Sequence, residues 1–471
     1  MAASDVPPIP PDLDRRRLPM DRCWSVPLAA AFSAFLLVMN SSCYGFLYVL
    51  FMEKYGVSHA EAAWPSSALV IAGSTVCVAV SAVQDKLSVY HITLVGGILA
   101  SLGLVASAFA PNIAWMTFTF GVLHGAGIGT ALMGFSLYIL LYFDKYKATA
   151  FAVMWVFRAA SGMTGTQILW HLTNNYGLQG CLLVTGGVLF NVVPFTRLIK
   201  SPSATRIHFG AFTKGRDLNT YNAVVQNHSS ETVQPSSQHP QDVAMVSSRR
   251  DHQFVTTRSF ASAVSGMRTW PFYVAVFYSA MCDYLFVTFN ATVVAYGVDK
   301  GCTLEDSKQV IIYNSIGLVV GRVVISFATD KVSSWRCPAA VASFLASAIC
   351  FLMLTRVSTY AGLVATASVM GVAQGYLLCV KSVIVSDHVG LECFTFCYGV
   401  AGLLSIPLWL SGPSIIGFFR DKNGSYDYLY IVLATLCLVH AALLGLLAWR
   451  EAMQRRHQRQ QRFCETDAPV L

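Results

Sequence analysis

The chain has 471 residues, of which 55% are hydrophobic and only 12% are charged, roughly half the charged share of a soluble globular protein. This composition excludes a soluble globular fold. The formal net charge of +8 does not indicate a nucleic-acid partner, because the basic residues lie in tails and short connections between apolar stretches. The class that remains is an all-α membrane protein.

Twelve apolar stretches are long enough to cross a bilayer, whose core of about 30 Å needs roughly 20 residues of helix. The predicted spans of the first half are Trp24–Leu50, Ala62–Val83, Tyr90–Phe109, Ala114–Tyr142, Ala148–Leu172 and Leu178–Ile199. Those of the second half are Thr269–Val298, Lys308–Ala328, Cys337–Thr355, Tyr360–Ser386, Phe394–Phe419 and Tyr428–Trp449. The first stretch is too long for the apolar region of a signal peptide, so we expect it to remain as a span.

These spans divide the chain into five segments. An N-terminal tail (1–23) precedes a six-helix bundle (24–199), and a polar linker (200–268) leads to a second six-helix bundle (269–449) and a C-terminal tail (450–471). The linker has few large aliphatic residues in its middle and is expected to be largely disordered. Basic residues of the tails, the linker and the connections share one side if the spans alternate, which predicts cytoplasmic termini.

The two halves repeat a short motif at the same relative place. The segment SAVQDKLS follows span two and contains Asp85, whereas SFATDKVS follows span eight and contains Asp330. Two six-helix units repeated in parallel are typical of the major facilitator fold. At these turns, contacts between Asp85 or Asp330 and neighbouring helices would stabilise one access state of a transporter. The alternative is that both are solvated turn residues.

Short segments at the ends of spans resemble the monocarboxylate transporter family, the solute carrier family 16 type. Asp21 and Trp24 resemble its acidic-Gly-Gly-Trp signature, with the two glycines replaced. The segment YFDKYKATAFA is similar to its second signature and supplies Tyr142, Phe143, Lys145 and Lys147. The segment SDHVGLECF, which contains Asp387, resembles its connection after span ten. The resemblance implies a plasma-membrane carrier of monocarboxylates and a single-span accessory glycoprotein as partner.

Four ionisable residues fall in the middle of predicted spans: Arg158, Asp283, Arg322 and Lys381. Such a residue costs about 2.5–3.5 kcal/mol to insert, so each is a candidate functional group. Arg322 aligns with the family arginine that binds the substrate carboxylate, and a guanidinium group matches carboxylate geometry. The alternative is a structural arginine held by carbonyl groups or a neighbouring carboxylate.

The other three positions are open to more than one interpretation. Asp283 needs a cationic partner or a shared proton, and it serves either the substrate or only the stability of its half. Arg158 is a candidate substrate contact outside the family pattern, whereas Lys381 is expected to extend toward the cytoplasm.

The sequence departs from the family pattern at two positions that concern coupling. Proton-coupled members carry a lysine in span one, where this chain has Ser42-Cys43-Tyr44-Gly45, and Tyr44 becomes a candidate substrate contact. They also carry an acid one helical turn before the arginine, where this chain has Leu318. We therefore expect uniport or ion-coupled exchange rather than lysine-dependent proton symport.

Taken together, the residues predict a secondary transporter of small organic anions, above all monocarboxylates, that works by alternating access. The alternative is a transporter-like sensor that binds a metabolite without turnover. The sequence has no metal-ligand spacing, nucleophile motif or phosphate-binding loop in a credible context, so we expect neither an enzyme nor a cofactor. The scattered cysteines are interpreted as small core residues.

Overall fold

The structure is a computed structural model that describes residues 21–57, 59–84, 86–199, 267–423 and 425–466. These residues form helices and connecting turns, without a β-strand among them. The helices of the first half are α2 (Ser25–Ser42), α3 (Tyr44–Tyr55), α4 (His59–Val83), α5 (Val89–Ala108), α6 (Ile113–Met116), η1 (Thr117–His124), α7 (Gly125–Tyr142), α8 (Lys147–Leu189) and α9 (Val192–Leu198). Those of the second half are α12 (Trp270–Asp299), α13 (Leu304–Val320), η3 (Gly321–Ile325), α14 (Ser326–Lys331), η4 (Ser333–Trp335), α15 (Arg336–Arg356), α16 (Tyr360–Val389), α17 (Leu391–Asn423) and α18 (Asp427–Thr466).

The predicted twelve-span architecture is confirmed. In the described part of the chain, 11 helical segments are long and apolar enough to cross a membrane, and one of them, Lys147–Leu198, has 52 residues. That segment turns back at Gly177, whose backbone has φ 67° and ψ 178°, a conformation that glycine adopts without steric cost. It therefore contains two spans, which the sequence predicts as 148–172 and 178–199, and the total is twelve.

Two span boundaries differ from the prediction. The first span, predicted as continuous, is divided at Cys43 into α2 and α3. The last helix, α18, continues through polar residues to Thr466, well beyond the predicted end at Trp449. The expectations for residues 1–20, for Asp85 and for the linker from 200 to 266 lie outside the described residues.

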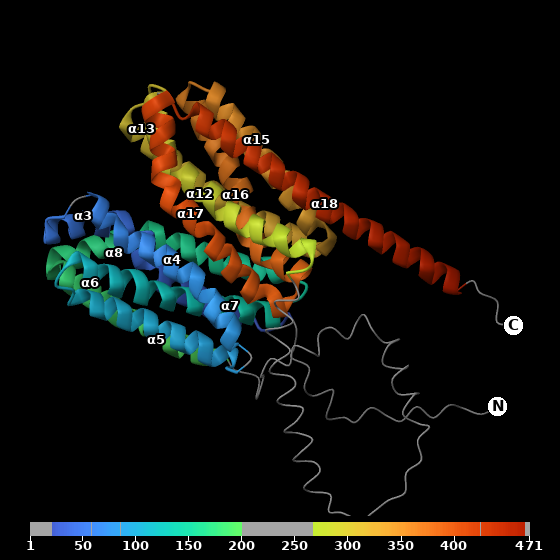
Figure 1. The fold of residues 1–471 in the computed structure, drawn as a ribbon, viewed down its shortest axis with the longest axis horizontal. Helices are drawn as coiled ribbons and strands as arrows, with labels where there is room; N and C mark the ends of the chain where they lie inside the picture. Colours follow the sequence, from blue (N-terminus) through green and yellow to red (C-terminus); the bar gives the residue numbers. More distant parts are fainter. Residues whose placement is uncertain (1–20, 58, 85, 200–266, 424, 467–471) are drawn as a thin grey trace, which may run out of the picture.

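The two halves of the chain form two helix bundles (Figure 1), with the blue-to-green half below the yellow-to-red half. We call one end of the molecule the linker end: α4, α7, α14 and α16 finish there, and α5, α8, α15 and α17 begin there. The opposite end is called the far end. In Figure 1 the linker end lies on the right, where α18 extends beyond the bundles.

Small residues allow close helix contacts within and between the halves. A Cβ atom on Gly129 would meet the backbone of Gly73 in α4, so α4 and α7 are packed backbone to backbone. Between the halves, Gly399 of α17 lies against Val78 of α4, and Gly402 lies against Ser74. Glycines thus allow α4 to approach both α7 and α17, and α4 and α17 form one of the contacts that join the bundles.

Candidate functional site

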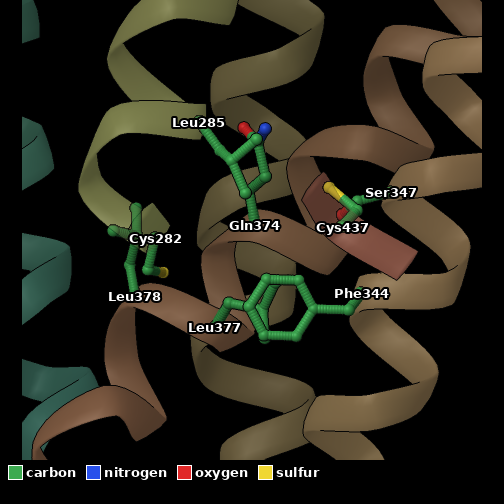
Figure 2. A pocket seen from close by; sticks show the side chains of 8 residues that line it. All are labelled: Cys282, Leu285, Phe344, Ser347, Gln374, Leu377, Leu378 and Cys437. Carbon is green, nitrogen blue, oxygen red and sulfur yellow. The ribbon is translucent and has the colours of Figure 1, made fainter. Parts of the chain in front are cut away.

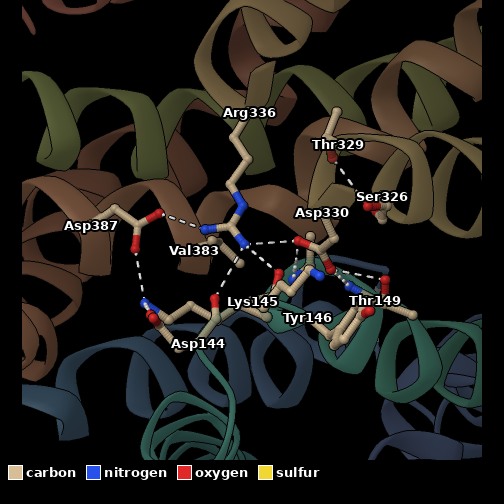
Figure 3. A network of polar contacts seen from close by, with 12 residues as sticks. Asp144, Lys145, Tyr146, Thr149, Ser326, Thr329, Asp330, Arg336, Val383 and Asp387 are labelled. Atoms are coloured by element: carbon tan, nitrogen blue, oxygen red, sulfur yellow. Dashed lines mark hydrogen bonds and ion pairs between the residues drawn. The ribbon is translucent and has the colours of Figure 1, made fainter. Parts of the chain in front are cut away.

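Polar side chains join the two halves at the linker end (Figure 3). Asp330, at the end of α14, accepts hydrogen bonds from the backbone N–H groups of Ala148 at 3.2 Å and Thr149 at 2.6 Å, and from the Thr149 hydroxyl at 2.8 Å. The first turn of a helix has N–H groups without helical partners and a partial positive charge, both of which favour a carboxylate. Asp330 of the second half therefore caps α8 of the first half.

Arg336 is the centre of this network, and the sequence analysis did not single it out. Its guanidinium group donates to Asp330 at 2.9 Å and to Asp387 at 3.1 Å, both in its own half. It also donates across the interface to the carbonyl oxygens of Asp144 at 3.3 Å and Lys145 at 2.9 Å. The signal available in the sequence was its position, directly after the turn that contains Asp330.

An ion pair crosses the interface beside Arg336. Lys147 Nζ lies 3.0 Å from Asp387 of the other half and 3.1 Å from Asp144 of its own. The network borders a polar cavity of about 550 Å³ at the linker end. The linker end is thus closed by contacts that would have to break for the two halves to separate there.

The signature residues of the first half gather around the turn that enters α8. Asp21 accepts hydrogen bonds from the backbone N–H groups of Asp144 and Tyr146, each at 3.1 Å. The Trp24 ring lies 5.1 Å from that of Phe143. Asp21 also donates its own N–H to the Tyr142 carbonyl oxygen at 2.9 Å. These residues, separated in sequence, hold the segment that presents Lys145 and Lys147 to the second half.

The four mid-span charged residues lie at one common depth. At about 1.5 Å per residue, they lie about 12–20 Å from the linker ends of their helices, near the middle of a bilayer core about 30 Å thick. They come from both halves: Arg158 from α8, Asp283 from α12, Arg322 from η3 and Lys381 from α16. We call this set the central cluster.

Within the central cluster, Lys381 and Asp283 form an ion pair. Lys381 Nζ lies 2.7 Å from both carboxylate oxygens of Asp283. The Lys381 side chain is 5% exposed, whereas that of Asp283 is 43% exposed. The expectation that Lys381 extends toward the cytoplasm is therefore wrong, because a buried ammonium group is better satisfied by a nearby carboxylate than by stretching to the interface. The cationic partner predicted for Asp283 is present.

The two arginines of the central cluster meet at Trp155. The Arg158 guanidinium lies 4.8 Å and that of Arg322 5.6 Å from the centre of the Trp155 ring, within cation–π range. Arg322 also donates to the Trp155 carbonyl oxygen at 3.0 Å, which joins η3 of the second half to α8 of the first. Trp155 was missed in the sequence because a tryptophan in an apolar span gives no distinctive signal.

Reciprocal glycine contacts pack the helices that carry Arg322 and Lys381 closely together. Gly317 and Gly321 approach the backbone of α16 at Ser368 and Val372, while Gly371 and Gly375 approach α13. Arg322 follows Gly321 in η3, a π-helical segment, and such segments are frequent at functional sites. The helix pair that presents both cations therefore has little freedom to shift.

A small enclosed cavity lies within the second half, next to the central cluster (Figure 2). Its volume is about 10 Å³, and its lining comes from α12, α15, α16 and α18, including Cys282, Ser347 and Gln374. A space of this size holds about one water molecule and excludes an organic anion. The central cluster, rather than this cavity, is the candidate substrate site.

Tyr44 is not brought to the central cluster by any contact in the described residues. Its hydroxyl donates to the Ala62 carbonyl oxygen at 2.6 Å, and its ring lies 5.9 Å from that of Phe120. Its predicted contact with substrate stays a prediction. In the described residues, no group of three or more His, Cys, Asp and Glu side chains is arranged to hold a metal ion.

Comparison with known proteins defines the class. The sequence model of the Major Facilitator Superfamily matches residues 30–405. The chain belongs to the Major Facilitator Superfamily, a family of membrane transporters, and its multi-pass membrane architecture follows from the same finding.

The nearer similarity is to monocarboxylate transporters, as the end-of-span motifs predict. Monocarboxylate transporter 12 of Xenopus laevis is 23% identical over 432 residues, covering 90% of this chain and 88% of that protein. Monocarboxylate transporter 10 of Danio rerio is 23% identical over 449 residues, covering 92% and 80%. Monocarboxylate transporter 9 of Pongo abelii is 20% identical over 476 residues, covering 90% and 92%.

Solved structures agree on the fold. FucP, a Major Facilitator Superfamily transporter crystallised in the outward conformation, matches with a TM-score of 0.61 at 13% identity, covering 90% of this chain and 99% of FucP. The proton:xylose symporter XylE bound to 6-bromo-6-deoxy-D-glucose matches with a TM-score of 0.61 at 12% identity, covering 90% and 95%. These similarities establish the two-bundle fold.

Proposed function

We propose that this chain carries small organic anions across the plasma membrane by alternating access, with both termini in the cytoplasm. The observation that carries the proposal is the central cluster, where Lys381 pairs with Asp283 and the two arginines, Arg158 and Arg322, contact Trp155. Cations at mid-membrane depth are costly to insert, so their presence indicates a functional site. Guanidinium and ammonium groups are suited to binding an anion. The names of the relatives, monocarboxylate transporters 12 and 10, support carboxylates as the first candidate substrates.

The position of the contacts between the two halves supports alternating access. Direct hydrogen bonds across the interface gather at the linker end, around Asp330 and Arg336, and deeper at Arg322. Rocking of the two bundles would break the linker-end network and expose the central cluster to the other side. The proposal includes a single-span accessory glycoprotein as partner, to be tested by copurification.

Proton coupling of the family type is not part of the proposal. The residue one turn before Arg322 is Leu318, and no lysine occupies the Ser42–Gly45 position, so the usual proton-binding groups are missing. We propose uniport or anion exchange, for which uptake does not depend on a proton gradient.

The proposal is tested by uptake of labelled carboxylates into expressing cells, with and without an inward proton gradient. Uptake should be independent of the gradient and should be lost in Arg322→Ala, with surface expression measured in parallel. Arg197→Ala, which removes an exposed arginine in α9, is the matched control and should retain uptake. Unchanged uptake and apparent affinity in Arg322→Ala would refute the role of Arg322.

A further inference from the structure

The central cluster has more positive than negative charge. The cluster has three cations, Arg158, Arg322 and Lys381, and one carboxylate, Asp283. Both oxygens of that carboxylate already accept a hydrogen bond from Lys381. In the described residues neither Arg158 nor Arg322 forms an ion pair with a carboxylate. With all groups in their usual ionisation states, the cluster carries two positive charges in excess.

Several donors in the cluster also lack an acceptor. Arg322 is 4% exposed, and its Nε–H has no hydrogen-bond partner, although its neighbouring terminal nitrogen donates to Trp155. The indole N–H of Trp155 is likewise buried without a partner. Next to these two donors, the Arg158 guanidinium lies over the Trp155 ring. A buried donor without an acceptor is costly, so these groups are positioned to bind an acceptor-rich ligand.

We propose that the substrate is an organic dianion with two carboxylate groups, one bound by Arg322 and one by Arg158, the two arginines that contact Trp155. The inference rests on the proposed function and narrows its substrate class. A monocarboxylate would leave one excess positive charge in a low-dielectric site, whereas a dicarboxylate neutralises both. Each guanidinium offers the planar fork that binds a carboxylate through two parallel hydrogen bonds.

The first arm of the test compares substrates that share a carbon skeleton. Uptake of labelled succinate into cells expressing the full chain is measured at pH 7.4, with unlabelled succinate, glutarate, monomethyl succinate and pyruvate as competitors. Removing one charge by methylation should weaken competition at least about tenfold. Equal competition by succinate and monomethyl succinate, or stronger competition by pyruvate, would overturn the inference and leave an organic-anion carrier in place.

The second arm changes the charge of the cluster. Arg158→Gln removes one positive charge and should raise the KM for succinate at least about tenfold while changing that for pyruvate much less. The double variant Asp283→Asn/Lys381→Gln keeps the excess charge and should keep the preference for succinate, whatever its absolute rate. Loss of the preference in the double variant but not in Arg158→Gln would overturn the assignment of Arg158.

Two further outcomes distinguish failure of the dianion inference from failure of the proposed function. If no carboxylate, with one charge or two, is taken up by cells with confirmed surface expression, the proposed function fails and the inference fails with it. If pyruvate is taken up and succinate is neither taken up nor competes, only the dianion inference fails.

Discussion

The linker-end network and the central cluster both bury charged groups between the halves. Only in the linker-end network does every charged group have a partner of opposite charge. At the linker end, Arg336 binds Asp330 and Asp387, and Lys147 binds Asp387 and Asp144. Each carboxylate there has a cation, and backbone groups of the first half add further hydrogen bonds to Asp330 and Arg336. In the central cluster, two arginines have an aromatic ring and a carbonyl oxygen as partners instead of a carboxylate.

This difference separates two uses of buried charge. A network in which the charges are paired stabilises one arrangement of the two bundles, because separating the bundles leaves charges without partners. A cluster with an excess of positive charge is stabilised by a ligand of negative charge. The identity of its residues is therefore determined by ligand binding rather than by packing. Variants at the two places should therefore affect different measurements.

The largest effect is expected for Arg336→Ala. It would leave the side chain of Asp330, which is fully buried, without a cation and would destabilise the closed linker end by about 3–5 kcal/mol. We expect uptake to fall and the thermal transition of purified protein to shift downward. Lys331→Ala, which removes another cation bordering the same cavity, should leave both close to wild type. An Arg336→Ala protein with normal uptake and thermal stability would contradict the closing role of the network.

The ion pair of the central cluster is tested by a double-mutant cycle. Asp283→Asn alone leaves the buried Lys381 ammonium without its partner, at a cost of about 2–5 kcal/mol. Lys381→Gln alone leaves the partly exposed Asp283 unpaired at a smaller cost, and the double variant removes both charges. We therefore expect the double variant to be more thermally stable than Lys381→Gln or Asp283→Asn. Strict additivity of the two single effects would show that the two side chains do not interact.

A smaller effect is expected where glycine holds the helices of the cluster together. In Gly321→Ala, the new Cβ would meet the Val372 carbonyl oxygen of α16, which should cost about 1–3 kcal/mol and displace the adjacent Arg322. Gly445→Ala is the matched control, because no atom lies within 4 Å of its Cβ position. Thermal unfolding and the KM for substrate would be measured for both. Equal behaviour of the two variants would contradict the close packing of α13 and α16.

The smallest effect is expected for Lys147→Gln. Its partner Asp387 is 30% exposed, so the ion pair is partly solvated and should contribute less than about 1 kcal/mol. Uptake should change no more than a few-fold, and the change should shrink as ionic strength rises. A loss as large as that of Arg336→Ala would show that Lys147, rather than Arg336, is the main contact across the linker end.

Much of the fold could be predicted because its signals are local. The length of each apolar stretch predicts a span, and the repeated turn around Asp330 predicts the two-bundle symmetry. The break at Cys43 was missed, although the polar residues Asn40, Ser41 and Ser42 directly precede it in the otherwise apolar stretch from Trp24 to Leu50. The helical continuation of α18 was missed because composition marks the end of an apolar span, not the end of a helix.

The candidate site could be predicted only in part, because its partners come from distant spans. The mid-span charges Arg158, Asp283 and Arg322 stand out in an apolar sequence, and their cost predicts function. Their arrangement depends on which helices are neighbours, so neither the Asp283–Lys381 pair nor the contact of both arginines with Trp155 follows from spacing. Arg336 was missed because a basic residue at the start of a span is usually interpreted as a topology signal.

The central claim, that the cluster around Arg322 binds an organic anion and passes it between the two sides of the membrane, is tested most directly by counterflow. Liposomes containing the purified full chain are loaded with unlabelled carboxylate and diluted into a trace of the labelled compound, which requires no coupling ion. The account predicts transient accumulation of label by the wild-type protein and none by Arg322→Ala. Binding of the labelled carboxylate without any counterflow would contradict it and would identify the chain as a sensor instead of a carrier.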